Sequence, residues 1–226
     1  MTMIRIPIKG TIVSSDEQEF YEWFGIECSS PKQIKKCMDE AADGEELTFE
    51  INSGGGNLFS GTEIYSMINA YTGAKHIDVV GIAASAASVI AMAAKSRITP
   101  SGMLMIHNVS SSASGDKSVM SHESGVLSKA DESVSKVYEM KTGLDKDTIL
   151  NLMEDETWMT ADDAVESGFI DEIIPSETLV NSVARILSNA EIEQARKEMK
   201  AAKEMTFINI EQEKLTLMKL KGATRC

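Results

Sequence analysis

The sequence predicts an α/β fold built on a parallel sheet. Short apolar segments rich in strand-forming residues alternate along the chain with amphipathic segments of helical period, a pattern typical of β-α-β units with right-handed crossovers. A length of 226 residues, 42% of them hydrophobic, is enough for one well-buried domain and an appendage. In addition, three segments with residue types common in active sites each follow directly after a predicted strand.

The first predicted elements are a strand and a helix. Residues 4–13 alternate apolar and polar side chains, and Pro7 within this run favours a position at the edge of the sheet. Ser30 followed by Pro31 has the residue types of a helix N-cap and first helical position. We therefore expect a helix from Pro31 to about Asp43, with one apolar face against the sheet.

Further strands and helices follow in alternation. Their expected ranges are a strand at 47–51, a glycine-rich loop at 52–57, a helix at 58–71, a strand at 77–82, a small-residue helix at 83–94 and a strand at 102–106.

The next part of the chain is predicted to be mainly helical. A long helix at 117–141 carries one apolar stripe and ends before Gly143, a residue that readily adopts the left-handed conformation at helix ends. A short helix at 147–153 is followed by a helix capped by Thr160. A closing strand at 169–174 completes the fold.

The distribution of charge separates a domain at 1–175 from a basic tail at 176–226. Residues 1–180 carry 13 Lys and Arg against 29 Asp and Glu, whereas the remaining residues carry nine against six. Within the tail, alternating acidic and basic residues predict a polar helix at 191–205. This tail could dock onto an acidic partner, be trimmed, or remain a solvated helix with a mobile terminus.

Composition excludes several classes of function. A net charge of −13 disfavours nucleic acid binding through phosphate neutralisation. No run approaches the ~20 apolar residues of a membrane span, and the start lacks a signal-peptide pattern. Three cysteines without paired spacing predict reduced thiols in the cytoplasm. Neither a metal-ligand cluster nor a nucleotide-binding glycine motif is present, so we expect no metal and no cofactor.

The three active-site-like segments should meet at one edge of the sheet. They are the glycines at 54–56, Ser85 and His107, each placed just after a predicted strand. In a parallel sheet the carboxyl ends of the strands share one edge, which is where open α/β sheets place their sites.

Ser85 and His107 are the candidate nucleophile and general base. Ser85 lies where a strand turns into a helix, and the amide of Ala86 could donate to an oxyanion. The alternative for Ser85 is a plain helix N-cap, because the G-x-S-x-G elbow is absent. Of the three histidines, His107 ends an apolar strand, while His76 and His122 are expected to face solvent.

The glycine segment and an acidic pair complete the candidates. Gly54 to Gly56 are expected to expose backbone donors to a ligand, with a flexible turn as the alternative. Asp155 and Glu156 precede Thr157-Trp158 and could lean toward the sheet edge, although such pairs are mostly solvated surface residues.

Four segments together resemble the Clp protease proteolytic subunit (ClpP-like) family of serine peptidases. The resemblance extends over about residues 4–175. Within this family, the chain is most similar to the ClpP-like head maturation (prohead) proteases of tailed phages and prophages. The segments are Ile51-Asn-Ser-Gly-Gly-Gly56, Gly81-Ile-Ala-Ala-Ser85-Ala86, Met105-Ile-His107-Asn108 and the run from Trp158 to Asp171.

The resemblance implies a role for five residues. Ser85 matches the nucleophile, His107 matches the base, and the amides of Gly56 and Ala86 match the oxyanion hole. Glu156 stands where the family usually has the triad aspartate, with the neighbouring Asp155 as the alternative. Gly54 replaces the usual proline of the family and Ala86 its frequent methionine, and both replacements leave the backbone donors intact.

The resemblance also implies the architecture and the biological role. The fold would be the ClpP/crotonase-like α/β spiral, assembled into a homo-oligomeric ring, heptameric or stacked, through a handle helix at 117–141. The function would be an ATP-independent or partner-assisted serine endopeptidase (EC 3.4.21.-) in the host cytoplasm, processing phage capsid or scaffold proteins. The alternatives are a ring-forming head component without peptidase activity and a crotonase-type acyl-CoA enzyme.

Overall fold

A computed structural model describes residues 3–41 and 45–175, together with 194 and 197. The chain separates into two units, Met1–Glu177 and Thr178–Cys226, and the fold described below is that of the first. Of the predicted tail helix at 191–205, only residues 194 and 197 are described, and both are helical. The predicted domain boundary after residue 175 stays a prediction.

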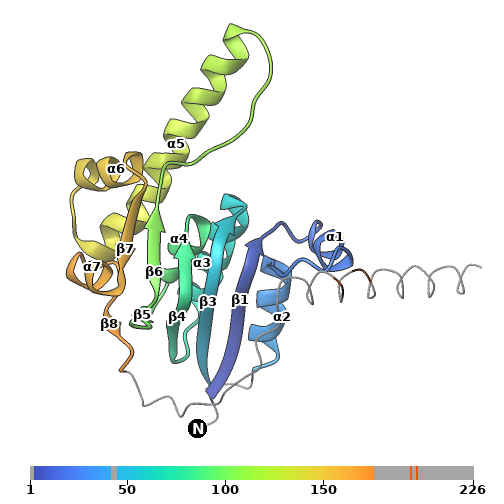
Figure 1. The fold of residues 1–226 in the computed structure, drawn as a ribbon, viewed down its shortest axis with the longest axis vertical. Coiled ribbons are helices and arrows are strands. Elements are labelled where there is room, and N and C mark those ends of the chain that lie inside the picture. The colour runs from blue at the N-terminus through green and yellow to red at the C-terminus, as the bar shows by residue number, and fades with distance from the viewer. Residues whose placement is uncertain (1–2, 42–44, 176–193, 195–196, 198–226) are drawn as a thin grey trace, which may run out of the picture. The chain divides into compact units, whose positions relative to one another are not determined.

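The first unit is an α/β fold on an eight-stranded sheet (Figure 1). Its central path runs β2-β1-β3-β4-β5-β8, and β6 branches from β4 and pairs with β7. All of these pairs are parallel except β6 with β7. The strands are β1 (Met3–Ile12), β2 (Cys28–Ser29), β3 (Glu46–Gly56), β4 (Lys75–Ala84), β5 (Lys95–Ile98), β6 (Met103–Ile106), β7 (Thr157–Thr160) and β8 (Glu172–Ile173).

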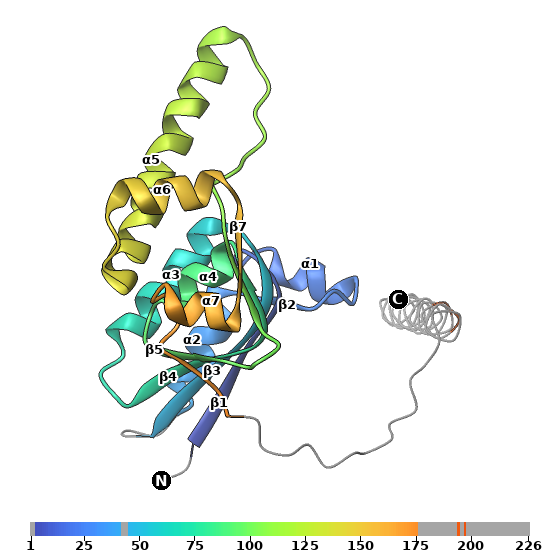
Figure 2. The same cartoon turned by 60° about the vertical axis from the view of Figure 1, so that its left-hand side comes forward.

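Seven helices pack around this sheet in the described residues. They are α1 (Gln18–Trp23), α2 (Pro31–Asp39), α3 (Leu58–Ala70), α4 (Ala86–Ala91), α5 (Lys117–Thr142), α6 (Lys146–Glu154) and α7 (Ala161–Glu166). None of them is long and apolar enough to cross a membrane. Figure 2 shows that α5 extends well beyond the sheet, and that the segment after β6 runs alongside the helix to its projecting end.

Capping residues explain where several helices begin and end. The Ser30 side chain accepts from Gln33 N, as its N-cap role predicts, and Thr160 forms a full capping box with Asp163. Gly143 ends α5 with φ of 74°. These local signals were readable from the sequence, and the helix boundaries agree with the expected ones to within a few residues.

Several strand predictions were wrong. The predicted loop at 52–57 is largely strand, because β3 continues to Gly56 in register with Ile12 of β1. The small-residue helix begins at Ala86, since β4 extends to Ala84. The closing strand is only Glu172–Ile173. The short elements α1, β2, β5 and β7 were not predicted, because they have no clear apolar period in the sequence.

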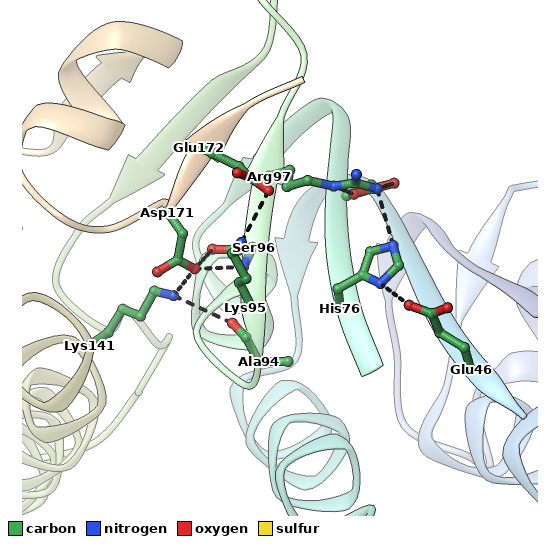
Figure 3. Close-up of polar contacts among 10 residues, drawn as sticks. Glu46, His76, Ala94, Lys95, Ser96, Arg97, Lys141, Asp171 and Glu172 are labelled. Carbon is green, nitrogen blue, oxygen red and sulfur yellow. Dashed lines mark hydrogen bonds and ion pairs between the residues drawn. The ribbon is translucent and has the colours of Figure 1, made fainter. Parts of the chain in front are cut away.

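A polar network lies at the amino-terminal ends of the central strands (Figure 3). Arg97 donates two hydrogen bonds of 2.8 Å to Asp78 and a third to His76 Nε2 at 3.1 Å. The hydrogen bond with Asp78 raises the pKa of Arg97. His76 Nδ1 lies 3.3 Å from Glu46, and its side chain is only 15% exposed. The prediction that His76 faces solvent was therefore wrong.

A second part of this network connects the C-terminal end of α5 to the sheet (Figure 3). Lys141 Nζ donates to Asp171 Oδ2 at 2.5 Å and to the carbonyl of Ala94 at 3.4 Å. The same carboxylate oxygen accepts from the Ser96 amide at 2.6 Å. Burial alone would raise the pKa of Asp171, but these hydrogen bonds and the Lys141 charge lower it on balance.

We predict that Asp171→Asn destabilises the fold at neutral pH by about 1–2 kcal/mol, because charge-assisted hydrogen bonds are lost. A carboxyl with a lowered folded-state pKa stabilises the fold above its ordinary pKa of about 4, and this stability is lost as the pH falls through the folded-state pKa. The difference in thermal unfolding between wild type and variant should therefore shrink from pH 6 towards pH 3.

The matched control is Glu172→Gln, the neighbouring carboxylate. Its partner Lys95 lies at 3.4 Å, and both side chains are about half exposed. Exposed pairs of this kind contribute little to stability. Equal effects of the two substitutions at every pH would contradict the anchoring role of Asp171.

Candidate active site

Ser85 occupies a strained turn between β4 and α4. Its φ of 55° and ψ of −126° lie outside the regions that non-glycine residues favour. The turn is held by the Ser85 amide, which donates to the carbonyl of Met105 at 3.0 Å. All six residues of α4 are buried, so burial of this helix offsets the local backbone strain of roughly 1–3 kcal/mol.

His107 contacts the Ser85 hydroxyl directly. Its Nε2 lies 2.8 Å from Ser85 Oγ. Strand pairing explains this meeting, because β4 and β6 are adjacent and parallel with Ala84 beside Met105. Ser85 and His107 both follow shortly after that pair, so their side chains reach the same end of the sheet.

A buried hydroxyl pair supports the turn from behind. Ser88 Oγ donates to the carbonyl of Ser85 at 2.6 Å and lies 2.8 Å from the hydroxyl of Tyr138. Tyr138 is 1% exposed, and burial raises the pKa of its hydroxyl. The turn is thereby linked to α5, on which Tyr138 lies.

Gly55 and Gly56 adopt backbone conformations that other residues rarely reach, with φ of 94° and 145°. A Cβ on Gly55 would lie 2.7 Å from Ser85 Cβ, and one on Gly56 would lie 2.2 Å from the carbonyl oxygen of Ile12. Gly54, by contrast, has open space around it. Close packing therefore requires glycine at positions 55 and 56. From the sequence, these glycines were expected only to expose backbone donors or to form a flexible turn.

A pocket of about 300 Å³ adjoins these residues. Gly56, Ser85, Ala86 and His107 all line it, and apolar residues of α5 form its opposite wall. Ala86 is the first residue of α4, so its amide has no acceptor within the helix. The arrangement gathers a hydroxyl, an imidazole and backbone donors around one space that can hold a peptide or an acyl group.

The backbone of Glu156, the predicted acid, lies opposite that of His107, but its carboxylate forms no hydrogen bond with the imidazole. The antiparallel register pairs Ile106 with Thr157, so one step further His107 stands opposite Glu156. The amides of Asn108 and Glu156 both donate to the carbonyl of Met153, at 3.0 and 3.2 Å. The Glu156 carboxylate, however, accepts from Trp158 Nε1 at 3.2 Å.

Asp155 is exposed at the C-terminus of α6. In the part of the chain that the structure describes, no hydrogen bond joins His107 to Asp155 or Glu156. Glu156 shares one unusual feature with Ser85: they are the two non-glycine residues with positive φ among the described residues, with 49° at Glu156. Such strain is concentrated at functional sites in proteins.

One residue that positions the chain after His107 was not predicted from the sequence. Asp131 on α5 accepts from the Val109 amide at 2.6 Å. Nothing in the sequence distinguishes this aspartate from the solvated acidic residues of a long helix.

Across the described ranges, no group of three His, Cys, Asp or Glu side chains could hold a metal ion.

Comparison with known proteins identifies the family. A sequence model described as Clp protease matches residues 32–177, which is more than half of the chain. The chain belongs to the Clp protease family. The ATP-dependent Clp protease proteolytic subunit 1 of Chlamydia abortus is 29% identical over 153 residues, covering 65% of this chain and 80% of that protein. The proteolytic subunit of Pleurastrum terricola is 31% identical over 132 residues, covering 57% and 67%.

A solved Clp structure has the same fold. A mutant of ClpP1 from Listeria monocytogenes superposes with a TM-score of 0.61 at 23% identity, covering 76% of this chain and 91% of that one. This likeness confirms the predicted ClpP-like α/β architecture, and the long helix predicted at 117–141 is present as α5.

We predict that Gly55→Ala disrupts the site of this Clp family member, because the added Cβ would overlap Ser85 Cβ and the carbonyl of Ala84, 2.6 Å away. A displacement of about 1 Å at a reacting group reduces rates roughly 10²-fold. The measurement is the rate at which a fluorophosphonate labels Ser85, followed by intact mass.

Gly54→Ala is the control, since a Cβ there meets nothing within 4 Å. It should label at close to the wild-type rate. Thermal unfolding of both variants separates a local displacement of Ser85 from loss of the fold. Wild-type labelling of Gly55→Ala would rule out the packing role assigned to this glycine.

Proposed function

We propose that this chain is a serine endopeptidase in which Ser85 is the nucleophile and His107 the general base. The observation that carries the proposal is the 2.8 Å contact between Ser85 Oγ and His107 Nε2 at a strained turn that faces the pocket. An imidazole at hydrogen-bond distance can accept the serine proton as the hydroxyl attacks a peptide carbonyl.

The remaining steps follow from the neighbouring groups. The amides of Gly56 and Ala86 stabilise the negative charge that develops on the carbonyl oxygen. The imidazolium then protonates the leaving amine, which leaves an acyl group on Ser85. A water molecule, deprotonated by His107, hydrolyses this ester and restores the free enzyme. No cofactor or metal is required in this scheme.

Glu156 is proposed as the group that orients His107. With Nε2 facing Ser85, the Nδ1–H of the neutral imidazole needs an acceptor on its other side. Glu156 stands opposite His107 in the continued strand register and shares the Met153 carbonyl with the next residue, Asn108. Its carboxylate must leave the Trp158 indole to reach the ring. Asp155 does not stand opposite His107 in this register, and its amide donates to the carbonyl of Asn151 instead of Met153.

The assembly and the substrate belong to the same proposal. We propose a homo-oligomeric ring formed through α5, whose projecting half carries exposed Val119 and Met120. The relatives named above are proteolytic subunits of ATP-dependent Clp proteases, which supports a protein substrate. The motif resemblance to prohead proteases supports phage capsid or scaffold proteins as that substrate, in the host cytoplasm.

We predict that Ser85→Ala lowers peptide hydrolysis by at least about 10⁴-fold, because the nucleophile is removed while the fold needs only its backbone. Hydrolysis of a fluorogenic peptide and fluorophosphonate labelling are measured together with circular dichroism. Ser66→Ala, an exposed residue of α3, should behave as wild type.

The same variant tests the biological role. In particles assembled with Ser85→Ala, the capsid and scaffold proteins should keep their full-length mass. Undiminished peptide hydrolysis by this variant would overturn the catalytic assignment. Normal head processing alongside lost peptide hydrolysis would overturn only the phage role.

We predict that Glu156→Gln reduces kcat roughly 10²–10⁴-fold, since a neutral amide neither fixes the imidazole tautomer nor stabilises the imidazolium. Asp155→Asn should retain at least half of the wild-type kcat. Both are measured with the same fluorogenic peptide at several pH values. A larger loss for Asp155→Asn than for Glu156→Gln would reverse the assignment of the acid.

A further inference from the structure

The pocket beside Ser85 extends along α5 as a groove. One wall is formed by the segment that follows His107, including Val109 and Ser111, and the other by α5. In Figures 1 and 2 this segment runs alongside the projecting half of α5. The groove walls are mainly apolar, from Val126, Leu127 and Ala130 among others.

Glu123 supplies the carboxylate of this groove. It lines the same pocket as Ser85 and His107, and the pocket lining contains no lysine or arginine. Its side chain accepts a hydrogen bond from the Ser111 hydroxyl, which is a neutral donor. Among the ion pairs between described residues, none involves Glu123.

A half-buried carboxylate with a neutral partner attracts a cation more strongly than a fully solvated one, because apolar walls lower the local dielectric constant. The Asp131 carboxylate, which accepts from the Val109 amide of the facing wall, adds negative charge eight residues further along α5, about 12 Å along the helix. The wider domain is strongly acidic as well, with 29 Asp and Glu against 13 Lys and Arg in residues 1–180.

The geometry of α5 gives the approximate distance from the cleaved bond. Val134 lines the pocket one helical turn before Tyr138, the α5 residue linked through Ser88 to the Ser85 turn, and lies eleven residues after Glu123, or about 16 Å along a helix. An extended peptide covers this span with about five residues. Since a long basic side chain reaches several ångströms itself, a residue roughly three to five positions from the cleaved bond could meet Glu123.

We propose that Glu123 is a specificity-determining residue that binds a Lys or Arg side chain of the substrate, so that the enzyme prefers peptides with a basic residue a few positions from the cleaved bond. This inference rests on the proposed peptidase function. The apolar walls bind the intervening residues, and the Glu123 carboxylate selects the basic one.

The experiment compares sets of fluorogenic peptides that differ at one position only, carrying Lys, Gln or Glu two to six residues from the cleaved bond. At one or two neighbouring positions, wild type should cleave the Lys peptide with a kcat/KM about 3–30-fold above that of the Gln peptide, the range expected for a partly buried ion pair. This ratio should shrink in 0.5 M salt.

Glu123→Gln should bring the Lys and Gln peptides to equal kcat/KM, and Glu123→Lys should favour the Glu peptide. Both variants should cleave the Gln peptide within about twofold of wild type. Glu132→Gln is the matched control, because this α5 carboxylate lies outside the pocket lining and pairs with Lys146 at 3.0 Å. Its preference should be that of wild type.

The outcomes distinguish the two proposals. If no peptide is cleaved by wild type, the peptidase function itself fails. If wild type cleaves the neutral peptide but shows no preference for lysine, or a preference that Glu123→Gln retains, the role of Glu123 is overturned. A change in oligomer mass in Glu123→Gln, measured by light scattering, would also overturn it and assign the residue to a contact between copies.

Discussion

The site depends on one constraint, which is that the chain must turn sharply at Ser85 while three other segments approach it closely. On the side of β3 and α3, the turn leaves no room for an added Cβ. A Cβ on Gly61 of α3 would lie 2.9 Å from Ala86 Cβ, and one on Gly55 would meet Ser85 itself. The alanines and glycines around Ser85 are therefore explained by packing, and the same packing keeps Ser85 in a backbone conformation that it would not adopt alone.

The helix α5 is bonded to the sheet and the Ser85 turn near its C-terminus, and its N-terminal half projects beyond the sheet. Tyr138 reaches the Ser85 turn through Ser88, and Lys141 bonds to Asp171 and Ala94 at the opposite end of the sheet. These contacts fix the orientation of the helix relative to Ser85. The projecting half thus forms one wall of a groove whose distance from Ser85 is set by the core, and both proposed roles of α5 depend on that rigidity.

Periodic apolar patterns made the α/β class, the order of the long elements and the meeting of Ser85 with His107 predictable. In a parallel sheet, features that follow successive strands share an edge whatever the details of packing. The short strand β7 was not predictable, because its four residues carry no period and it pairs through tertiary contacts with β6. The register that places Glu156 opposite His107 could therefore come only from the structure.

Glu156 and Glu123 differ in how well the sequence predicts them. No motif marks Glu123, whose place in the groove comes only from the structure. Glu156 could be located by counting back from a motif, but its bond to Trp158 depends on a local left-handed turn with φ of 49°. This exposed hydrogen bond contributes little net free energy, about 1 kcal/mol. A carboxylate bonded to an imidazolium gains more, because both partners are charged. In the proposed mechanism, the charge that forms on His107 during attack by Ser85 therefore favours transfer of the Glu156 carboxylate from the indole to the imidazole, at the step that needs the acid.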